Sequence, residues 1–216
     1  ASLTTWAQAQ HCLVLGPRSF GLMRPGGKLN ASIHPVAPQA GKIAVVSQSR
    51  TIATALLDWN ENAQVGFSTV VDLGEEMDVD LAAVLDYLAV DAQTDSIVLY
   101  LHSHPMARRF ASAIYAASAA KPIIVLKAGG IHEGPALRAR EEVFSALMRR
   151  VGAIRVRYLM QLYAALKVLS LKRRVKGSRI AIVSNGDGVA QLAVDIMRHG
   201  TIVELATLST KTRHAL

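Results

Sequence analysis

Mainly apolar runs alternate with segments of helical periodicity through most of the chain. The runs predict buried strands, and they lie at 43–47, 66–73, 96–101 and 122–127. The intervening segments repeat apolar residues at helical spacing and predict helices at 51–62, 79–90, 106–119 and 136–150, the second of them capped by Asp78. Apolar strands that alternate with helices indicate a parallel sheet covered on both faces. The pattern therefore predicts an α/β fold, with a doubly wound, flavodoxin-like domain over residues 41–156.

A second cycle of the same pattern begins near the C-terminal end. It predicts, in order, a helix at 159–169, a basic linker at 172–178, a strand at 179–184, a helix at 188–198 and a strand at 201–205. Only about 40 residues follow the linker, too few for an independent α/β domain of ordinary size. We therefore expect the start of a second flavodoxin-like domain over 179–216, preceded by a helix and basic linker over 157–178.

The first 40 residues combine a helix-like opening with a stretch rich in proline and glycine, and they offer little apolar surface to bury. We interpret residues 1–40 as the tail of, or the linker from, an upstream domain. Both ends of the pattern predict that the chain is an excerpt of a longer protein, or that it needs partner domains.

The charge of the chain is unevenly distributed. The 216 residues include 24 Lys and Arg against 16 Asp and Glu, a net charge of +8 with neutral histidines. Residues 1–148 carry 11 basic and 13 acidic residues (net −2), whereas residues 149–216 carry 13 and 3 (net +10). The densest basic run, 172–176, contains no aromatic residue for base stacking and lies in no nucleic-acid-binding motif. We assign this run to linker surface and expect no nucleic-acid partner.

The cysteine content and the hydropathy bear on the compartment. A single cysteine, Cys12, excludes a disulfide framework and a cysteine-based zinc site, and it is typical of a reducing compartment. No apolar run approaches the ~18–20 residues of a membrane span, and the N-terminal residues lack the features of a signal peptide. We predict a cytoplasmic location and no membrane partner.

Two strand-to-helix turns are alike in their residue types. Small and hydrogen-bonding residues fill 47–51 (SQSRT) and 184–188 (SNGDG). In open α/β sheets such turns lie at the ligand-binding edge, where the N–H groups and the dipole of the next helix favour an anion. The pattern is typical of phosphate sites, although a purely structural turn remains the alternative for each.

Two other turns carry side chains of chemical interest. His102 and His104 follow the third strand and supply half of a metal site, but no third ligand stands at a suitable spacing, so we predict no metal. The glycine-rich loop 127–135 carries His132 and Glu133, which makes it the place to look for a reacting side chain. A plain surface loop is the alternative.

Several segments resemble the NDP-forming acyl-CoA synthetases, relatives of the succinyl-CoA synthetase subunits. The sequence LGPRSFGL at 15–22 is similar to the "LGPNS-GL" element of that family. Further matching segments follow in the order of the family: 29–32 (LNAS), 41–49 (GKIAVVSQS), 56–59 (LLDW), 65–68 (VGFS), 85–88 (LDYL), 97–101 (IVLYL), 121–129 (KPIIVLKAG) and 182–188 (IVSNGDG). The likeness is strongest to the synthetase-like region of Pat-type protein lysine acetyltransferases, where this architecture is fused to a GNAT domain.

The resemblance implies a mechanism in which a loop histidine is phosphorylated and carries the phosphoryl group from an acyl-CoA site to a nucleotide site. The family holds the phosphohistidine between two helix N-termini. By this resemblance Ser47, Gln48 and Ser49 belong to one phosphate-facing turn, and Asn185, Gly186 and Gly188 belong to the other. The family also implies CoA or acyl-CoA and ATP or ADP with Mg, an upstream CoA-binding domain, further downstream domains and a possible homo-oligomer.

The chain departs from the family pattern at three places. The histidine of the usual "SHTGALAG" loop aligns with Glu133 without a gap, or with His132 after a shift of one residue. The loop is shorter than is normal, unless residues are missing after Gly129. The glutamate that partners the histidine corresponds to His102, which cannot replace a carboxylate. Arg50 stands where a small residue is usual, and its guanidinium would either occupy the phosphate position or bind the phosphate.

Three functional hypotheses follow. The departures favour a catalytically degenerate region that handles acyl-CoA or regulates a Pat-type acetyltransferase, with the GNAT domain outside these residues. The alternative is an active NDP-forming acyl-CoA synthetase that works through a phosphohistidine. The third hypothesis is a non-enzymatic assembly module whose basic second half docks acidic surfaces.

Overall fold

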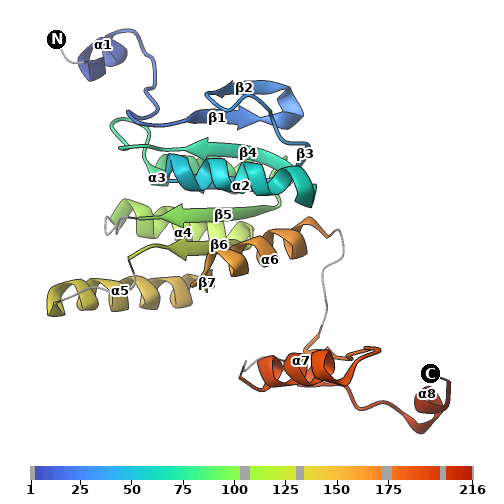
Figure 1. The fold of residues 1–216 in the computed structure, drawn as a ribbon. Coiled ribbons are helices and arrows are strands. Elements are labelled where there is room, and N and C mark those ends of the chain that lie inside the picture. The colour runs from blue at the N-terminus through green and yellow to red at the C-terminus, as the bar shows by residue number, and fades with distance from the viewer. Residues whose placement is uncertain (1–2, 103–107, 130–133, 172–176, 200–202, 216) are drawn as a thin grey trace. The chain divides into compact units, whose positions relative to one another are not determined.

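The computed structural model describes residues 3–102, 108–129, 134–171, 177–199 and 203–215 (Figure 1). The chain divides into two compact units, Ala1–Lys172 and Arg173–Leu216. Each unit is described by itself below.

The first unit is built on a seven-stranded sheet with the order β2-β1-β4-β3-β5-β6-β7. Neighbouring strands from β4 to β7 are parallel, whereas β1 pairs antiparallel with both β2 and β4. The strands are β1 (Gly21–Arg24), β2 (Leu29–Ser32), β3 (Ala40–Ser47), β4 (Phe67–Asp72), β5 (Ser96–Leu101), β6 (Ile123–Lys127) and β7 (Ile154–Val156).

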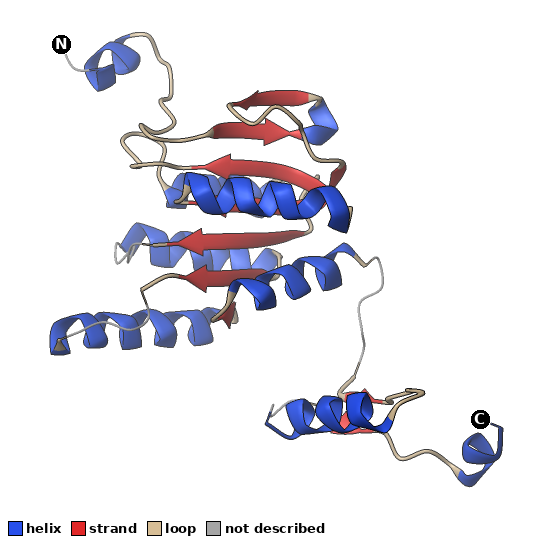
Figure 2. Cartoon of the chain, viewed as in Figure 1, coloured by secondary structure: helices blue, strands red, loops and turns tan. Residues whose placement is uncertain are grey.

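Helices cover both faces of this sheet (Figures 1 and 2). Buried residues of α3, α4 and α5 pack in one apolar cluster, and those of α2 and α6 pack in the other. The helices of the unit are α1 (Leu3–Ala9), the 3-10 helix η1 (Pro25–Gly27), α2 (Arg50–Ala63), α3 (Leu81–Val90), α4 (Arg108–Ala120), α5 (Pro135–Val151) and α6 (Leu159–Ser170). The predicted α/β fold with a covered, mainly parallel sheet is confirmed.

The side-chain alternation of β3 shows why the sheet needs two layers. Ala44 and Val46 face the cluster with α3, α4 and α5, while Val45 between them faces the cluster with α2 and α6. All three residues are at most 1% exposed. Successive side chains of a strand point to opposite faces, so a strand without polar positions is stable only when both faces are buried.

The N-terminal segment differs from the predicted linker. β1 and β2 extend the sheet, and Phe20 and Met23 are buried in the cluster with α2 and α6. Gly21 has a φ of +112°, and a Cβ there would lie 2.2 Å from the carbonyl oxygen of Ala31. The hairpin therefore depends on glycine at this position, and its four-residue strands are too short to give a periodic signal.

The start of α3 corrects the predicted cap. Asp80, not Asp78, is the N-cap residue, and its Oδ1 accepts a hydrogen bond from the Ala83 N–H at 2.8 Å. Asp78 instead accepts the N–H of Val14 at 2.9 Å and thereby fixes the N-terminal segment to this loop. Aspartate is a favoured N-cap residue, so the sequence alone allows either Asp78 or Asp80 to cap the helix. In the structure Asp78 bonds to Val14, and Asp80 forms the cap.

The helix at 159–170 also belongs to the first unit. Leu162 and Leu166 of α6 are fully buried against the sheet, and Tyr163 stacks on Trp59 of α2 with ring centroids 4.5 Å apart. The segment expected as a helix before the linker is therefore part of the core, and five of the linker residues, 172–176, lie outside the described residues.

The second unit contains a small parallel βαβ arrangement. β8 (Arg179–Ile180) pairs with β9 (Glu204–Leu205), α7 (Asp187–His199) lies between them in the chain, and α8 (Thr210–Ala215) follows. The strands are shorter than the predicted 179–184 and 201–205. Val189, Leu192 and Ile196 line one side of α7 and are 64–74% exposed. No described helix in either unit is long and apolar enough to cross a membrane.

Candidate functional site

The turn between β3 and α2 is held by the hydroxyl of Ser47. This buried hydroxyl accepts the N–H of Ser49 and donates to the Ser49 carbonyl, both at 2.9 Å. Ser49 is the N-cap residue of α2, in an extended conformation (φ −137°, ψ 116°), and its Oγ accepts the Ile52 N–H at 3.5 Å. The two serines thus fix the backbone at the point where the helix begins.

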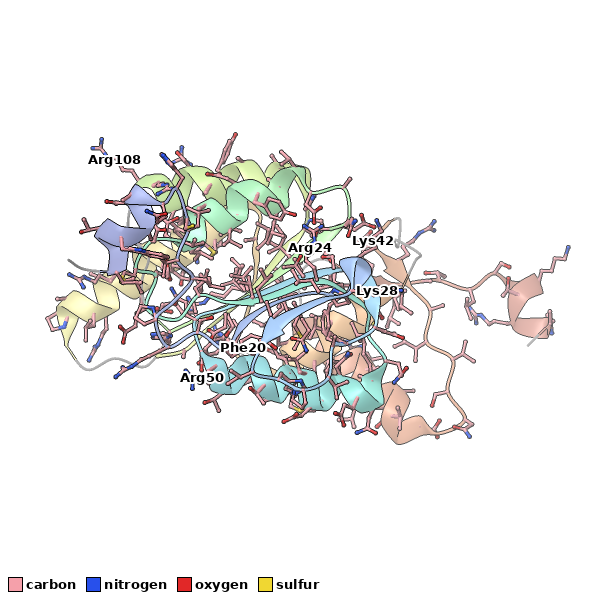
Figure 3. All side chains as sticks on the ribbon, turned by 90° about the horizontal axis from the view of Figure 1, so that it is seen from above. Phe20, Arg24, Lys28, Lys42, Arg50 and Arg108 are labelled. Carbon is pink, nitrogen blue, oxygen red and sulfur yellow. The ribbon has the colours of Figure 1, made fainter. Side chains whose placement is uncertain are left out.

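Two helix N–H groups remain available at this turn. A helix leaves its first N–H groups without intrahelical acceptors, and Ser49 Oγ caps only that of Ile52. Those of Arg50 and Thr51 have no acceptor among the residues that the structure describes. Arg50 is exposed at the beginning of α2 (Figure 3). Free N–H groups, the helix dipole and a guanidinium are features that favour an anion at a helix N-terminus.

Gln48 connects this turn to two neighbouring loops. Its Oε1 accepts the backbone N–H of His102 at 3.1 Å, and its Nε2 donates to a carboxylate oxygen of Glu76. The other oxygen of Glu76 accepts the Leu81 N–H at 2.9 Å, at the beginning of α3. The side chain of Gln48 therefore connects the loops that follow β3, β4 and β5. The place of Gln48 in a phosphate-facing turn stays a prediction.

Asp72 lies directly behind the turn, at the end of β4. Its carboxylate is buried and accepts the N–H of Phe20 at 2.7 Å and, more weakly, that of Gly74 at 3.4 Å. Burial raises the pKa of Asp72 above 3.8, against the lowering effect of these hydrogen bonds and of the positive charges of Arg50 and His102. Asp72 thus interacts electrostatically with Arg50 and His102.

The sequence reasoning missed Asp72 and Glu76. A signal was available, because Asp72 at the end of the second predicted strand and Glu76 in the acidic run after it reach the same edge as the other strand-end turns. It becomes convincing only once β4 is known to lie next to β3.

Of the three candidate histidines, only His102 lies in the part of the chain that the structure describes. His102 follows β5, and its ring is exposed. His132 and Glu133, like His104, lie outside the described residues, so their roles stay predictions. Within the described ranges, no three His, Cys, Asp or Glu residues are grouped closely enough to hold a metal ion.

The second predicted turn repeats the first one in its backbone. Ser184 Oγ accepts the Gly186 N–H at 3.1 Å and donates to the Gly186 carbonyl at 2.9 Å. α7 begins one residue later at Asp187, as α2 begins at Arg50 directly after Ser49. Asn185, Gly186 and Gly188 are all exposed.

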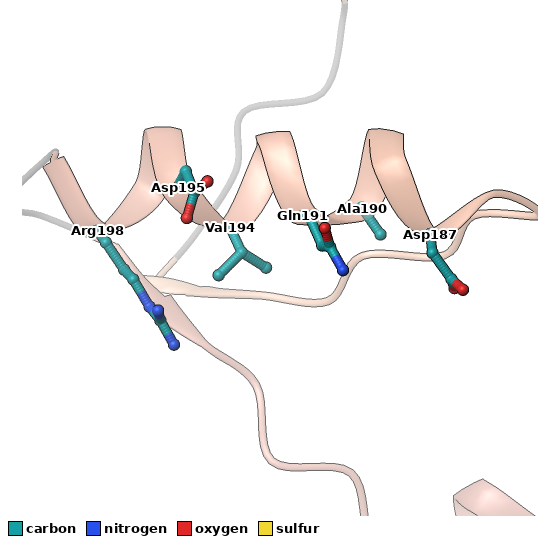
Figure 4. Close-up of a pocket in the computed structure, with 6 residues that line it drawn as sticks. All are labelled: Asp187, Ala190, Gln191, Val194, Asp195 and Arg198. Atoms are coloured by element: carbon teal, nitrogen blue, oxygen red, sulfur yellow. The ribbon is translucent and has the colours of Figure 1, made fainter.

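A pocket of about 390 Å³ in the second unit is lined only by α7 (Figure 4). Its charged residues are Asp187, Asp195 and Arg198. With two acids against one base, this pocket is not suited to an anion.

The sequence that forms the covered parallel sheet matches a known protein family. The succinyl-CoA ligase-like flavodoxin domain matches residues 40–169, more than half of the chain, and the chain belongs to this family. The match extends beyond the predicted 41–156 to include α6.

Curated relatives are ADP-forming acyl-CoA ligases. The chain is 31% identical over 190 residues to the alpha subunit of acetate–CoA ligase (ADP-forming) I from Pyrococcus furiosus, a match that covers 84% of the chain and 41% of the relative. It is 33% identical over 201 residues to 4-hydroxybutyrate–CoA ligase (ADP-forming) from Nitrosopumilus maritimus, covering 88% and 29%. The chain therefore spans less than half the length of these relatives.

A solved structure of an acetyl-coenzyme A synthetase also resembles this chain. The dinucleotide-forming acetyl-coenzyme A synthetase 1 of Ca. Korarchaeum cryptofilum, in complex with phosphate and ADP, matches with a TM-score of 0.82 at 26% identity, over 93% of this chain and 46% of that one. The predicted relationship to NDP-forming synthetases is confirmed, whereas the link to Pat-type acetyltransferases stays a prediction.

Proposed function

We propose that the chain is the flavodoxin-like part of an NDP-forming acyl-CoA synthetase, and that its β3–α2 turn binds the phosphoryl group during turnover. The overall reaction converts acyl-CoA, NDP and phosphate into the acid, CoA and NTP. The observation that carries the proposal is the pair of free N–H groups of Arg50 and Thr51 at a helix N-terminus. The ADP-forming relatives support it over a purely regulatory role.

Arg50 adds charge to this site. Its guanidinium stands at the first position of α2, where it opposes the helix dipole, so helix stability alone gives no reason for a cation there. A bound phosphoryl group would neutralise it, and Asp72 behind the turn contributes to its electrostatic environment. The departure from a small residue is thus compatible with phosphate binding.

The remaining parts of the reaction are assigned by family resemblance. His132, or Glu133 in the ungapped alignment, occupies the position of the phosphorylated residue. CoA and the nucleotide with Mg would bind largely to domains outside this chain. The resemblance assigns Asn185, Gly186 and Gly188 to a second phosphate-facing turn.

The test separates the N–H group of Arg50 from its side chain. Arg50→Pro removes both, and proline is tolerated here because Arg50 is the first helical residue and Ser49 is already extended. Arg50→Ala removes only the guanidinium. ATP formation from acetyl-CoA, ADP and phosphate is measured with the full-length protein. We expect Arg50→Pro to be about tenfold less active than Arg50→Ala, because it also loses one hydrogen bond to the anion.

Helicity by circular dichroism and the urea midpoint establish that Arg50→Pro is folded. Equal activities of the two folded variants would contradict a role for the N–H group. Acid-labile labelling of the protein by radioactive phosphate, lost in His132→Ala, would assign the phosphorylated residue. Labelling that persists in that variant would refute His132.

His102 favours a second candidate function, the catalytically degenerate, acyl-CoA-responsive region. In the family a carboxylate orients the phosphorylated histidine, and in this chain the imidazole of His102 replaces that carboxylate. Because His102 is exposed, a glutamate can be accommodated at this position. In this case the full-length protein binds acetyl-CoA without forming ATP. His102→Glu would then restore measurable ATP formation, whereas an active wild-type protein that His102→Glu does not improve would exclude this candidate.

A further inference from the structure

An ion triad lies at the end of β6 and joins three elements of the first unit. Lys127, the last residue of β6, contacts Glu141 of α5 with its Nζ at 3.1 Å. The other carboxylate oxygen of Glu141 is paired with Arg155 of β7. The ring centroid of Phe144, also on α5, lies 5.8 Å from Lys127 Nζ and 5.4 Å from the guanidinium carbon of Arg155. The triad therefore connects β6 and β7 to α5.

Fold stability alone gives a poor account of this triad. The side chain of Lys127 is completely buried, and those of Glu141 and Arg155 are 14% and 22% exposed. Desolvation offsets much of the attraction within a buried ion pair, so apolar residues of similar size are often equally stabilising. The triad also places two cations against one acid, and the Nε of Arg155 is buried without an acceptor in the described part of the chain.

The triad includes the first residue of α5 that is not exposed. This helix begins at Pro135, residues 135–140 are all exposed, and its buried residues lie only from Phe144 onward. Its N-cap residue, Gly134, has no side chain that could cap it, and its N-terminal turns project past the carboxyl end of β6 (Figure 1). The ion pairs of Glu141 are therefore the partly buried contacts nearest to the beginning of the helix.

The contact between Lys127 and Glu141 joins the two ends of the glycine-rich loop. At the first end, Lys127 Nζ also donates to the carbonyl of Ala128 at 3.0 Å, and Gly129 follows with a φ of +72°. At the second end, Gly134 has a φ of +103°, and α5 begins at the next residue. Positive φ values of this kind favour glycine, so the backbone changes direction at both ends. One buried ion pair thus connects the exit from β6 to the helix that follows the loop.

We propose that Lys127 and Glu141 are positioning residues whose ion pair holds the two ends of this loop at a fixed separation, so that its candidate phosphorylated residue, His132 or Glu133, can react. The inference rests on the proposed function, because the phosphorylation step gives this loop its chemical role. In this role neither Lys127 nor Glu141 contacts the substrate. Lys127 Nζ is already bonded to Glu141 and to the Ala128 carbonyl, which suits an anchor of the backbone.

The test replaces Lys127 by methionine in the full-length protein. Lys127→Met removes the ammonium group but leaves Glu141 paired with Arg155, so the carboxylate keeps a partner. We expect the urea midpoint to change little, while acid-labile labelling by radioactive phosphate in the presence of acetyl-CoA becomes about tenfold slower or more. The KM values for acetyl-CoA and ADP should stay the same, so the loss appears in kcat.

A second measurement does not depend on activity. Amide hydrogen exchange should become faster in residues 138–143 of Lys127→Met, while residues 144–151 keep wild-type rates because their apolar contacts remain. Glu141→Gln should have the same effects on labelling and exchange, and Glu141→Asp, which keeps the charge, should recover part of the labelling rate. The double variant Lys127→Met, Glu141→Gln should be no slower than the slower single variant, because the two residues form one contact.

Arg24→Met is the matched control. Arg24 also pairs with a carboxylate, that of Asp91 at 3.1 Å, and it also lies over an aromatic ring, that of Tyr87 at 5.5 Å (Figure 3). It is the last residue of β1, and because β1 is antiparallel to β4, it lies at the amino edge of the sheet, opposite to Lys127. We expect wild-type labelling and wild-type exchange of α5 in this variant.

The outcomes are separable. Absence of label in the wild type would overturn the proposed function and this inference with it. A labelled wild type together with equally fast labelling of Lys127→Met would overturn the inference alone. Unchanged exchange in residues 138–143 would do the same, as would an equal loss of labelling in Arg24→Met. A large fall of the urea midpoint in Lys127→Met would assign the ion pair to fold stability and also overturn the inference.

Discussion

The turns at the beginnings of α2 and α7 have the same serine–backbone hydrogen bonds, but they differ in charge, burial and tertiary contacts. In both, a serine hydroxyl bridges the N–H and the carbonyl of the residue two positions later, and the helix begins at the next residue. The first helical residue is Arg50 in one turn and Asp187 in the other. The same local geometry therefore presents opposite charges at a helix N-terminus.

The surroundings differ as strongly as the charge. Ser47 is fully buried and Gln48 is 6% exposed, whereas their counterparts Ser184 and Asn185 are exposed. The first turn is tied through Gln48 to the loops after β4 and β5, but the second has only its own serine bridge among the contacts that the structure describes. A serine at this spacing is thus enough to shape the turn, whereas its burial and its links to other loops come from tertiary contacts and its charge comes from the first helical residue.

The largest expected difference between the turns concerns this rigidity. Gln48→Ala leaves the His102 N–H and the Glu76 carboxylate without their partner, and we expect a loss of about 1–3 kcal/mol in the free energy of unfolding. Asn185→Ala, at the equivalent position of the other turn, should change it by less than about 0.5 kcal/mol. Urea unfolding followed by circular dichroism measures both. Equal losses would show that the network of Gln48 adds nothing.

The next difference concerns the charge at the helix start. Arg50→Asp gives the first turn the charge of the second, and we expect it to weaken phosphate binding about tenfold or more. Asp187→Arg makes the reverse exchange and should strengthen binding at the second turn about two- to fivefold. Titration with inorganic phosphate, followed by the amide chemical shifts of Thr51 and Gly188, resolves the two sites. If neither exchange changes the affinity, backbone N–H groups alone determine binding.

The sequence was sufficient to predict those features that depend on local pattern. The alternation of apolar strands and helices predicted the covered parallel sheet, and the serine-containing turns were found at the beginnings of α2 and α7. The antiparallel hairpin of β1 and β2 was not predicted, because strands of four residues carry too few positions for a period to be recognised.

The parts of the site that depend on strand order were harder to predict from the sequence. Asp72 faces the turn because β4 lies beside β3, a neighbour relation that periodicity does not contain. The resemblance placed Gln48 in a phosphate-facing turn, which stays a prediction, but it did not predict that its amide contacts Glu76 and the backbone of His102. The partners of a long polar side chain are set by tertiary structure, so its residue type alone left this open.

The smallest expected effect concerns Asp72, the buried acid behind the first turn. Its pKa is raised by burial, so the native state retains the proton to higher pH than the unfolded chain does. The contribution of Asp72 to the free energy of unfolding therefore falls as the pH rises above 3.8, through the raised pKa. Asp72→Asn does not titrate but keeps a carbonyl acceptor for the Phe20 N–H.

We expect the free energy of unfolding of Asp72→Asn, relative to that of the wild type, to increase with rising pH in urea unfolding. Asp187→Asn serves as the exposed control. A difference between wild type and Asp72→Asn that is constant from pH 4 to pH 7, a range chosen to span the expected window, would contradict the raised pKa.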